Sequence, residues 1–328
     1  MIMNSLCALA LGFALDMIFG DPDRKYYPVR LVKRLVRNLE KMLRQAYADT
    51  PEAQNMAGVM LVVITLLITV GITVTVMIIC YKINVVLGIV FEGLLCWFSL
   101  SGKYLSTDLQ SVFRAAKAQN TESVHRYLKR FTDRDVEGLG LEDCIKCAIE
   151  EGAENTVDWV IGPIFWTMLL GGAGGFFCRV INIMDNEVGF RSEEFEHIGK
   201  VAAKLDDVVM FLPARLGALL MRLDTAFLKL DSKGAAEVYS RDRKKSPSPN
   251  SGHPMAVCAG ALNIELGSDE YYGGRVLKKP RIGDSYRKAG ADEIFWTQQL
   301  MIGSEAMVMI TAVIVRVVVY IAYLGLIK

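Results

Sequence analysis

Four stretches of the chain are long, apolar and nearly free of charge, and they give the sequence its main pattern. They are Leu6–Phe19, Met56–Tyr81, Val85–Leu100 and Met301–Ile327. Met56–Tyr81 contains no charged residue and is long enough to cross a bilayer with some tilt. The other three stretches each contain one or two charged residues. The pattern therefore predicts about four transmembrane helices.

A fifth apolar stretch, Trp159–Phe177, contains the glycine-rich run Gly171–Gly175, which favours a turn. We predict a re-entrant or buried hairpin here, because a turn exposed to lipid would leave its backbone groups unsatisfied. The alternative is a full crossing in which Val208–Met221 returns through the membrane. That return stretch contains Pro213 and Arg215, so we rank it second.

Basic residues are concentrated between the apolar stretches. Thirty-four of the 37 Lys and Arg residues lie within residues 20–55, 101–156 and 178–300. The positive-inside rule makes these three loops cytoplasmic. This distribution predicts one polytopic membrane domain over residues 1–328, with a large part in water.

Most of the remaining chain has a helical pattern. Arg30–Leu43 alternates apolar and basic residues at helical spacing, which predicts an amphipathic helix lying on the membrane. Leu105–Arg130 and Leu141–Glu151 are predicted to be helices outside the membrane, and Arg241–Pro254 a loop. Alternation of period two does not persist anywhere in the sequence. The predicted fold is an all-α integral membrane protein whose amphipathic and cytoplasmic helices form a polar site at the membrane surface.

Composition agrees with this fold. Hydrophobic residues make up 52% of the 328 residues, charged residues reach 22%, and the mean hydropathy is +0.30. A net charge of +1 argues against nucleic-acid binding by bulk charge. Seven cysteines are an odd number, which argues against a disulfide framework. Cys144 and Cys147 form a lone Cys-x-x-Cys pair, so buried thiols are a better expectation than half of a zinc site.

Acidic residues stand directly before the apolar stretch Trp159–Leu170, where charge is costly. Glu150, Glu154 and Asp158 are four residues apart, so on a helix they share one face. Such a face can bind a divalent cation or a cationic substrate group. The alternative is that these acids only favour the N-terminus of a helix.

A second group of acids follows. Asn182 and Asp185 are three residues apart and lie on one stripe of a helix. Asp206 and Asp207 are adjacent, and together with Asp185 they fit a magnesium site that is completed by phosphate oxygens. The alternative is that one of the adjacent acids caps a helix beginning near Val208.

The predicted loop Arg241–Pro254 combines basic side chains with hydroxyl and amide groups. Such a loop suits a phosphate or the carboxylate of a large anion. The alternative is a solvated linker between helices, although the run Pro249–Gly252 favours an ordered turn. The sequence contains no Walker A loop, dinucleotide-binding fingerprint or serine nucleophile elbow.

Taken in order, short motifs along nearly the whole chain resemble those of the adenosylcobinamide-phosphate synthase family, membrane enzymes of cobalamin biosynthesis. The motifs are Gly20-Asp21-Pro22, Pro28-Val29-Arg30, Glu154-Asn155-Thr156-Val157-Asp158, Asn182 with Asp185, Val188-Gly189-Phe190-Arg191, Leu205-Asp206-Asp207-Val208, Pro213-Ala214-Arg215-Leu216, Ser248-Pro249-Asn250, Tyr272-Gly273-Gly274 and Ile282-Gly283-Asp284. The chain departs from the family pattern at Tyr27, where His is usual, at Trp159, where a small residue is usual, and at Met255, where an acid is usual. The family's Leu-Asp-Ser-Met run is replaced by Met184–Glu187.

The resemblance implies an ATP-dependent ligation at a cytoplasm-facing site in the inner cell membrane. A carboxylate of the corrinoid adenosylcobyric acid is joined through an amide bond to aminopropanol phosphate, with Mg²⁺ as cofactor and ATP as co-substrate. The residues expected at the amine are Glu154, Asn155 and Asp158, and either carboxylate would accept its proton. The residues expected to hold the metal are Asp185, Asp206 and Asp207. The residues expected to bind phosphate or other substrate groups are Arg30, Asn182, Arg191, Arg215, Arg241, Arg243, Ser248 and Asn250.

Two other functions stay open at this point. Membrane regulators of β-lactamase induction are distantly similar to the family, which leaves a sensor as an alternative. A corrinoid transporter is another, because charged residues in membrane spans often mark transport pathways. The expected partners are the lipid bilayer, the two substrates and other late enzymes of the same pathway, whereas nucleic acid is not expected.

Overall fold

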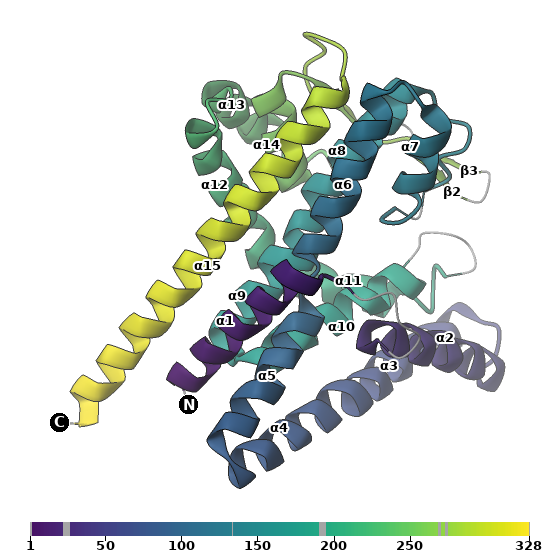
Figure 1. Ribbon diagram of the computed structural model, residues 1–328. Helices are drawn as coiled ribbons and strands as arrows, with labels where there is room; N and C mark the ends of the chain where they lie inside the picture. The colour runs from purple at the N-terminus through teal and green to yellow at the C-terminus, as the bar shows by residue number, and fades with distance from the viewer. Residues whose placement is uncertain are drawn as a thin grey trace. The chain divides into compact units, whose positions relative to one another are not determined.

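The computed structural model describes residues 2–21, 27–132, 134–189, 195–267, 270–272 and 275–327, and these are almost entirely helical (Figure 1). The helices form two compact units. Unit 1 contains Met1–Ser101, Gly162–Met210 and Ile310–Lys328, and unit 2 contains Gly102–Ile161 and Phe211–Met309. That residues 1–328 form one polytopic membrane domain stays a prediction.

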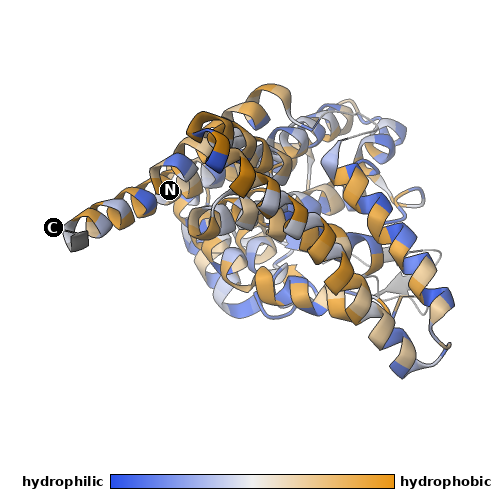
Figure 2. Ribbon diagram, turned by 90° about the horizontal axis from the view of Figure 1, so that it is seen from below, coloured by the Kyte–Doolittle hydropathy of each residue, from blue (hydrophilic) through white to orange (hydrophobic). Residues whose placement is uncertain are grey.

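Among the described residues, four helical stretches are long and apolar enough to cross a membrane. They are Ile2–Phe19, Pro51–Ile83, Val85–Lys117 and Ala291–Gly325. Figure 2 shows that hydrophobic residues dominate the long helices. Only 11% of the most apolar window of Pro51–Ile83 is buried, so most of this surface faces outward, as expected for a helix in lipid. The fold is therefore an all-α integral membrane protein, as predicted.

Unit 1 is built from helices of the N-terminal third of the chain and of a later segment that begins at Gly162. Its elements are α1 (Ile2–Phe19), α2 (Pro28–Ala46), α3 (Pro51–Leu66), the π-helical η1 (Leu67–Gly71), α4 (Ile72–Ile83), α5 (Val85–Ser99), α9 (Gly162–Leu170), α10 (Gly172–Val188) and α11 (Lys200–Val209). Helix α5 packs against both α1 and α4. Asn84 makes the turn between α4 and α5, and its side chain accepts a 2.7 Å hydrogen bond from the N–H of Val86. The apolar stretches Met56–Tyr81 and Val85–Leu100 are therefore separated by a turn at Asn84.

The predicted hairpin in Trp159–Phe177 is present as the helix pair α9 and α10, which pack against each other. The turn between the two helices contains fewer residues than the run Gly171–Gly175 suggested. Only Gly171 leaves the helical conformation, with φ at +75°, and residues 172–175 form the first turn of α10. A side chain at Gly171 would be strained by this φ and would also meet Glu92 and Ser5, so glycine is required there.

Glu92, the only charged residue of α5, closes this hairpin. Its Oε1 accepts a 2.9 Å hydrogen bond from the N–H of Gly172, the first residue of α10. The hydroxyls of Ser5 in α1 and Tyr81 in α4 donate to the same carboxylate. Because the first N–H groups of a helix lack helical partners and carry partial positive charge, a carboxylate is stabilising there. Glu92 thus joins four helices inside an apolar unit.

Helix α2 was predicted to lie on the membrane with its apolar face, and this orientation is wrong. Its apolar face is buried and packs within unit 1 against α3 and α10. Lys33 and Arg37 also join α2 to α10, because both form ion pairs with Glu187, the first at 3.2 Å. The period of the sequence identified the helix, but an apolar stripe fits a protein neighbour as well as a bilayer.

Unit 2 is also mostly helical. Its elements are α6 (Gly102–Lys117), α7 (Thr121–Leu128), α8 (Leu141–Thr156), the π-helical η2 (Val157–Ile161), α12 (Phe211–Phe227), α13 (Ser232–Asp242), α14 (Gly252–Leu262) and the first half of α15 (Ala291–Ile327). The predicted single helix Leu105–Arg130 is two helices. The chain breaks at Gln119, which has a φ of +55°, and Asn120 caps α7 through a 2.9 Å bond from the N–H of Ser123.

Four very short strands accompany these helices. They are β1 (Glu265–Leu266), β2 (Glu270–Tyr272), β3 (Arg275–Leu277) and β4 (Ile282–Gly283). β1 pairs with β4 and β2 with β3, both antiparallel. Segments this short are consistent with the lack of a lasting period-two pattern.

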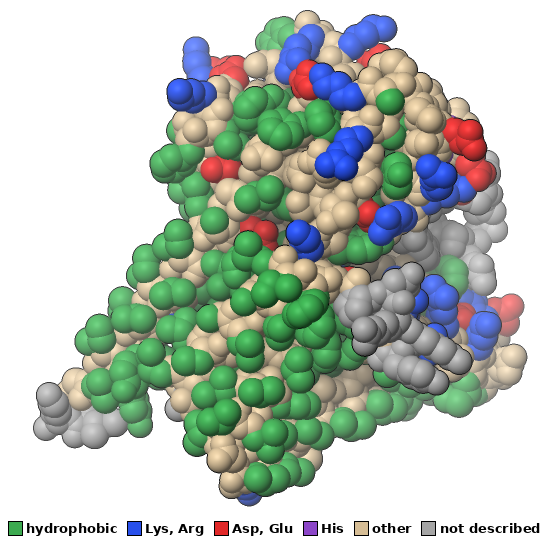
Figure 3. Space-filling model, in the orientation of Figure 1, with side chains coloured by type: hydrophobic (Ala, Val, Ile, Leu, Met, Phe, Trp, Pro, Cys, Tyr) green, Lys and Arg blue, Asp and Glu red, His purple; other side chains and the backbone are tan. Residues whose placement is uncertain are grey.

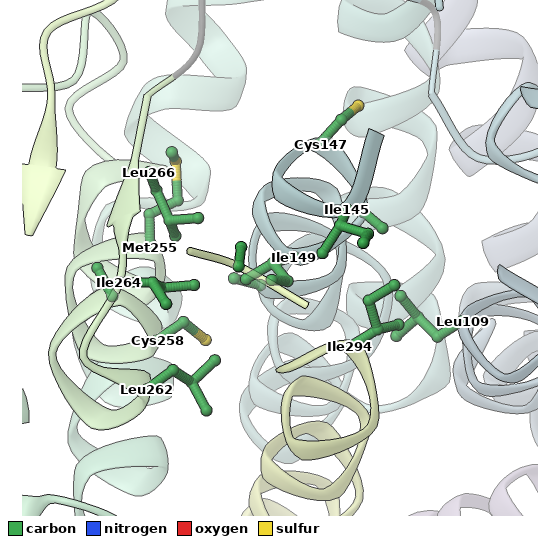
Figure 4. Packing of buried hydrophobic residues seen from close by; sticks show 14 of the residues in the cluster. Leu109, Ile145, Cys147, Ile149, Met255, Cys258, Leu262, Ile264, Leu266 and Ile294 are labelled. Atoms are coloured by element: carbon green, nitrogen blue, oxygen red, sulfur yellow. The ribbon is translucent and has the colours of Figure 1, made fainter. Parts of the chain in front are cut away.

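The core of unit 2 lies around α8. Figure 4 shows Ile145, Cys147 and Ile149 of α8 beside buried side chains of α14, such as Cys258. Cys144 is also buried, and burial raises its pKa to about 12. The Cys-x-x-Cys pair therefore consists of neutral core thiols, as predicted.

We predict that Glu92→Ala lowers the free energy of unfolding by about 3 kcal/mol, because it leaves buried N–H and O–H groups without an acceptor. Val90→Ala on the exposed face of the same helix is the control and should change it by about 0.5 kcal/mol or less. Unfolding of both purified variants in detergent, followed by circular dichroism, measures the difference. Equal stability of the two variants would contradict the role given to Glu92.

Candidate functional site

Four basic side chains gather in unit 2 around the ring of Tyr239 and the imidazole of His253. We call them the cationic cluster, and its members are Arg215, Arg222, Arg243 and Lys244. The guanidinium carbons of Arg222 and Arg243 lie 5.1 and 5.2 Å from the centre of the Tyr239 ring. Such cation–π contacts hold arginines in place without neutralising their charge.

His253 is buried within reach of this charge. Its Nδ1 is 3.0 Å from the hydroxyl of Tyr239. Burial, together with Arg215, Arg243 and Lys244, lowers the pKa of His253 to about 4. The imidazole is therefore neutral at pH 7, and its low pKa results first from burial and then from the neighbouring positive charges.

The segment between α13 and α14 is an ordered turn. The Oγ of Ser248 accepts hydrogen bonds from the N–H groups of Asn250 and Ser251 at 3.2 and 3.4 Å. Asn250 is buried, and its Oδ1 accepts a 3.2 Å bond from Nη1 of Arg215. The predicted loop Arg241–Pro254 is shorter than expected, because its first two residues end α13 and its last three begin α14.

Arg215 is oriented from its own helix as well. Its guanidinium carbon lies 3.4 Å from the centre of the Phe211 ring, and Nη1 donates to the Phe211 carbonyl at 2.6 Å. Burial and the nearby charge of Arg243 act to lower the pKa of Arg215. These contacts fix the guanidinium and leave its charge uncompensated.

Arg241 has a different environment from the cationic cluster. It makes two hydrogen bonds to Asp242, at 2.8 and 2.9 Å, and one to Asp284 at 3.1 Å. Burial acts to raise the pKa of Asp242, but Arg241, Lys245 and the N–H of Gly283 outweigh it and hold this pKa well below its ordinary value. The structure thus favours a structural role for Arg241 over the predicted phosphate contact.

Within the residues that the structure describes, no carboxylate lies within ion-pair distance of the cationic cluster. The three arginines of the cluster are half-buried and Lys244 is exposed, and partly buried charge without an opposite charge nearby is costly. Guanidinium groups match phosphate and carboxylate oxygens in geometry and charge. The cluster is therefore suited to binding a multiply charged anion.

Glu150 is not part of an open acidic face. It is fully buried, with Arg134 Nη1 at 2.6 Å from one oxygen and the N–H of Gly267 at 2.7 Å from the other. Burial acts to raise the pKa of Glu150, but Arg134, Lys279 and the Gly267 N–H outweigh it and lower the pKa. Glu150 is therefore an ionised structural residue.

Glu154 and Asp158 are half-buried and lie on opposite sides of the change from α8 to η2. π-helical turns often occur at functional sites, and this one shifts Asp158 from the face that a regular helix would give it. Asn155 is buried, and its Nδ2 donates to the Phe131 carbonyl at 3.2 Å, which holds the loop after α7.

Helix α12 crosses η2 closely. A Cβ on Gly217 would lie 2.9 Å from the Val157 side chain. Asp158 is the neighbour of Val157, and Arg215 is two residues before Gly217. The candidate base and the cationic cluster thus lie on elements of unit 2 that pack together.

The other predicted site residues belong to unit 1. Asn182 is buried on α10, Asp185 is half-buried three residues later, and Arg30 is exposed near the start of α2. Asp206 and Asp207 lie inside α11, which ends at Val209, so neither caps a helix that begins near Val208. Arg191 is outside the described residues.

The predicted metal site of Asp185, Asp206 and Asp207 stays a prediction. Within the described ranges, no group of three or more His, Cys, Asp or Glu side chains is arranged to hold a metal ion. Helices α10 and α11 do pack together, but Asp185, Asp206 and Asp207 do not converge on one point.

Unit 1 also contains a polar cluster that the sequence analysis did not assign. Buried Arg179 donates from Nη2 to Ser101 at 2.9 Å, and Ser101 donates to Asp21 at 2.8 Å. Tyr27 donates to the same carboxylate at 3.2 Å. Burial raises the pKa of Asp21, against the opposing effect of Arg179. The sequence feature that could have indicated this cluster is Asp21, which lies in the motif Gly20-Asp21-Pro22 directly after an apolar helix.

Together, the fold and the site define an integral membrane protein of the all-α class with a cluster of basic side chains in its second unit. The family model described as CobD/Cbib protein matches residues 9–301. The chain therefore belongs to the CobD/Cbib family.

Relatives cover nearly the whole chain. "Cobalamin biosynthesis protein CobD" of Clostridium perfringens is 34% identical over 94% of this chain and 97% of its own length. CobD of Klebsiella pneumoniae is 32% identical over 90% of this chain and 93% of its own length. "Cobalamin biosynthesis protein CbiB" of Salmonella arizonae is 31% identical, with coverage of 92% and 95%. No solved structure matches the chain. The family membership supports a role in cobalamin biosynthesis.

His253 should make stability depend on pH. Its folded-state pKa of about 4 is below the ordinary 6.5, so the unfolded chain binds a proton first as the pH falls. This contribution to the free energy of unfolding is fully present above pH 6.5 and is lost as the pH falls toward 4. By pH 5 the loss is about 2 kcal/mol. Unfolding temperatures of the purified protein and of His253→Gln, measured from pH 7 to pH 5, test this. The substituted protein should lose less stability, and equal losses would contradict the assignment.

Proposed function

We propose that the chain catalyses ATP-dependent amide formation between a carboxylate of adenosylcobyric acid and the amine of an aminopropanol phosphate. The cationic cluster of unit 2 is the observation that most supports this proposal. Both ATP and the amine substrate carry phosphate, and the cluster supplies uncompensated guanidinium groups on fixed helices. Family membership supports the same pathway.

The reaction needs two steps. A carboxylate oxygen of the corrinoid attacks the terminal phosphorus of ATP, which gives an acyl phosphate and releases ADP. The amine then attacks the acyl carbon, phosphate leaves, and the amine loses a proton. Cations near the transferred phosphoryl group stabilise the charge that develops in the first step.

Arg215 and Arg243 are our candidates for phosphate binding, with Asn250 as the neighbouring polar group. Asn250 positions the Arg215 guanidinium through its 3.2 Å hydrogen bond. Glu154 or Asp158 is proposed to accept the amine proton, because both are half-buried and belong to unit 2. A general base of this kind must reach the proton that it removes, either directly or through one water molecule.

We propose Mg²⁺ as the ion that accompanies ATP. A Mg²⁺ ion held mainly by substrate phosphates needs only one or two protein carboxylates, so a full triad is not required. Asp206 and Asp207 stay the candidates on that basis.

The proposed site faces the cytoplasm of the inner cell membrane. The distribution of Lys and Arg supports this orientation. A transporter is less well supported, because Glu92 and Arg316, two charged residues within the spans, have structural partners. Glu92 caps α10, and Nη2 of Arg316 donates to the Thr167 carbonyl at 2.5 Å.

Purified protein with adenosylcobyric acid, aminopropanol phosphate and Mg-ATP tests the proposal, with product mass as the readout. Arg215→Gln should lower kcat/KM about 10- to 100-fold, because it removes charge-assisted bonds to phosphate. Separate titration of ATP and of the amine shows which phosphate the cluster holds.

Lys233→Gln on the exposed side of α13 is the matched control. It removes one positive charge from unit 2 outside the cationic cluster and should leave kcat/KM within about threefold of the unsubstituted protein. Equal effects of the two substitutions would mean that the cluster is not the phosphate site. Absence of amide product from the unsubstituted protein would contradict the proposed reaction.

A further inference from the structure

Helix α12 exposes a row of large apolar side chains on its outer face. Leu212, Leu219, Leu223 and Phe227 are each between 50 and 76% exposed. They are separated by seven, four and four residues, which places them on one side of a helix. Leu216, which is half-buried, fills the gap in the row. In Figure 3 hydrophobic side chains gather over the edge of unit 2 where α12 and α15 lie.

The inner face of α12 is already occupied. Ala214, Ala218 and Met221 are fully buried, and α12 packs against η2, α13 and α14. The outer row therefore contributes nothing to the core of unit 2. Contiguous exposed apolar patches of this kind mark a surface that has an apolar partner.

The position of two arginines restricts what this partner can be. Arg215 and Arg222 are seven residues apart, so they lie along one flank of α12, beside the apolar row. Both are half-buried and reach Phe211 and Tyr239 inside unit 2. A helix with a wide apolar face and basic residues along its edge suits the boundary between acyl chains and headgroups.

The apolar surface also continues onto a candidate membrane span. Within unit 2, α12 touches α15 where a Cβ on Gly303 would lie 2.0 Å from Oδ2 of Asp224. Ile302, the neighbour of Gly303, is 43% exposed. The span Ala291–Gly325 must contact lipid over much of its length, so the row on α12 extends a surface of the same chemistry.

We propose that α12 lies along the membrane–water interface, with its apolar row among the acyl chains and its arginine flank toward the headgroups. The helix has 17 residues and is about 26 Å long, which is shorter than a hydrocarbon core of about 30 Å. A crossing would also place Arg222 inside that core, at high cost. An interfacial helix avoids both problems.

This inference does not depend on the proposed reaction. It has a consequence for the cationic cluster, because Arg215 and Arg222 belong both to the cluster and to the flank of α12. The anion-binding site then lies at the level of the lipid headgroups.

Tryptophan quenching by brominated phospholipids tests the proposal on the full-length protein in nanodiscs. Leu212→Trp, Leu219→Trp and Phe227→Trp place a probe at the start, middle and end of the row, at exposed positions where folding should tolerate them. Lys233→Trp on the exposed side of α13 is the control. The signal of the unsubstituted protein, with its four native tryptophans, is subtracted.

The proposal predicts that all three probes in α12 are quenched at least threefold more than the control. Bromines attached near the headgroup should quench all three probes more strongly than bromines attached deep in the acyl chains. Stronger quenching of Leu219→Trp by bromines deep in the bilayer would show a crossing helix and overturn the proposal. Quenching at the control level would also overturn it, and burial of the row by a second copy of the chain would then appear as a dimer in mass photometry.

Discussion

The carboxylate of Glu92 is the contact on which unit 1 depends. In an apolar environment each unpaired backbone group is costly, so a helix that begins inside such a unit needs an acceptor for its first N–H groups. Glu92 supplies that acceptor to α10 and draws in hydroxyls from α1 and α4. Because α10 begins at this point, the positions of Asn182 and Asp185 along it follow from the same contact.

Unit 2 uses charge in two different ways. Buried acids such as Glu150 and Asp242 are compensated by arginines and by backbone N–H groups, and their pKa values are lowered accordingly. Arg215 and Arg243 are held by aromatic rings, an amide and carbonyl groups, none of which neutralises them. Burial and these positive charges together lower the pKa of His253. Positive charge that the fold keeps in place without compensating it is the feature that points to an anionic substrate.

The sequence was sufficient for elements with a long, simple period. The membrane-length helices, the hairpin after Trp159 and the ordered turn at Ser248–Asn250 are all present. The sequence was insufficient where the same pattern of residues can contact either of two different partners. The stripe of α2 fits a helix or a lipid surface equally well, and an acid such as Glu150 can bind a ligand or an arginine far away in the chain. The pairing of Arg241 with Asp284 and the position of Arg243 over the Tyr239 ring depend on tertiary contacts, which spacing alone does not contain.

The most direct measurement is an electron cryo-microscopy structure of the protein in nanodiscs with a non-hydrolysable ATP analogue and aminopropanol phosphate. The account predicts phosphate density within hydrogen-bond distance of the Arg215 and Arg243 guanidinium groups, beside Asn250. Phosphate density elsewhere, with Arg215 and Arg243 in contact with neither substrate, would contradict the claim that the cationic cluster of unit 2 binds the anionic substrate.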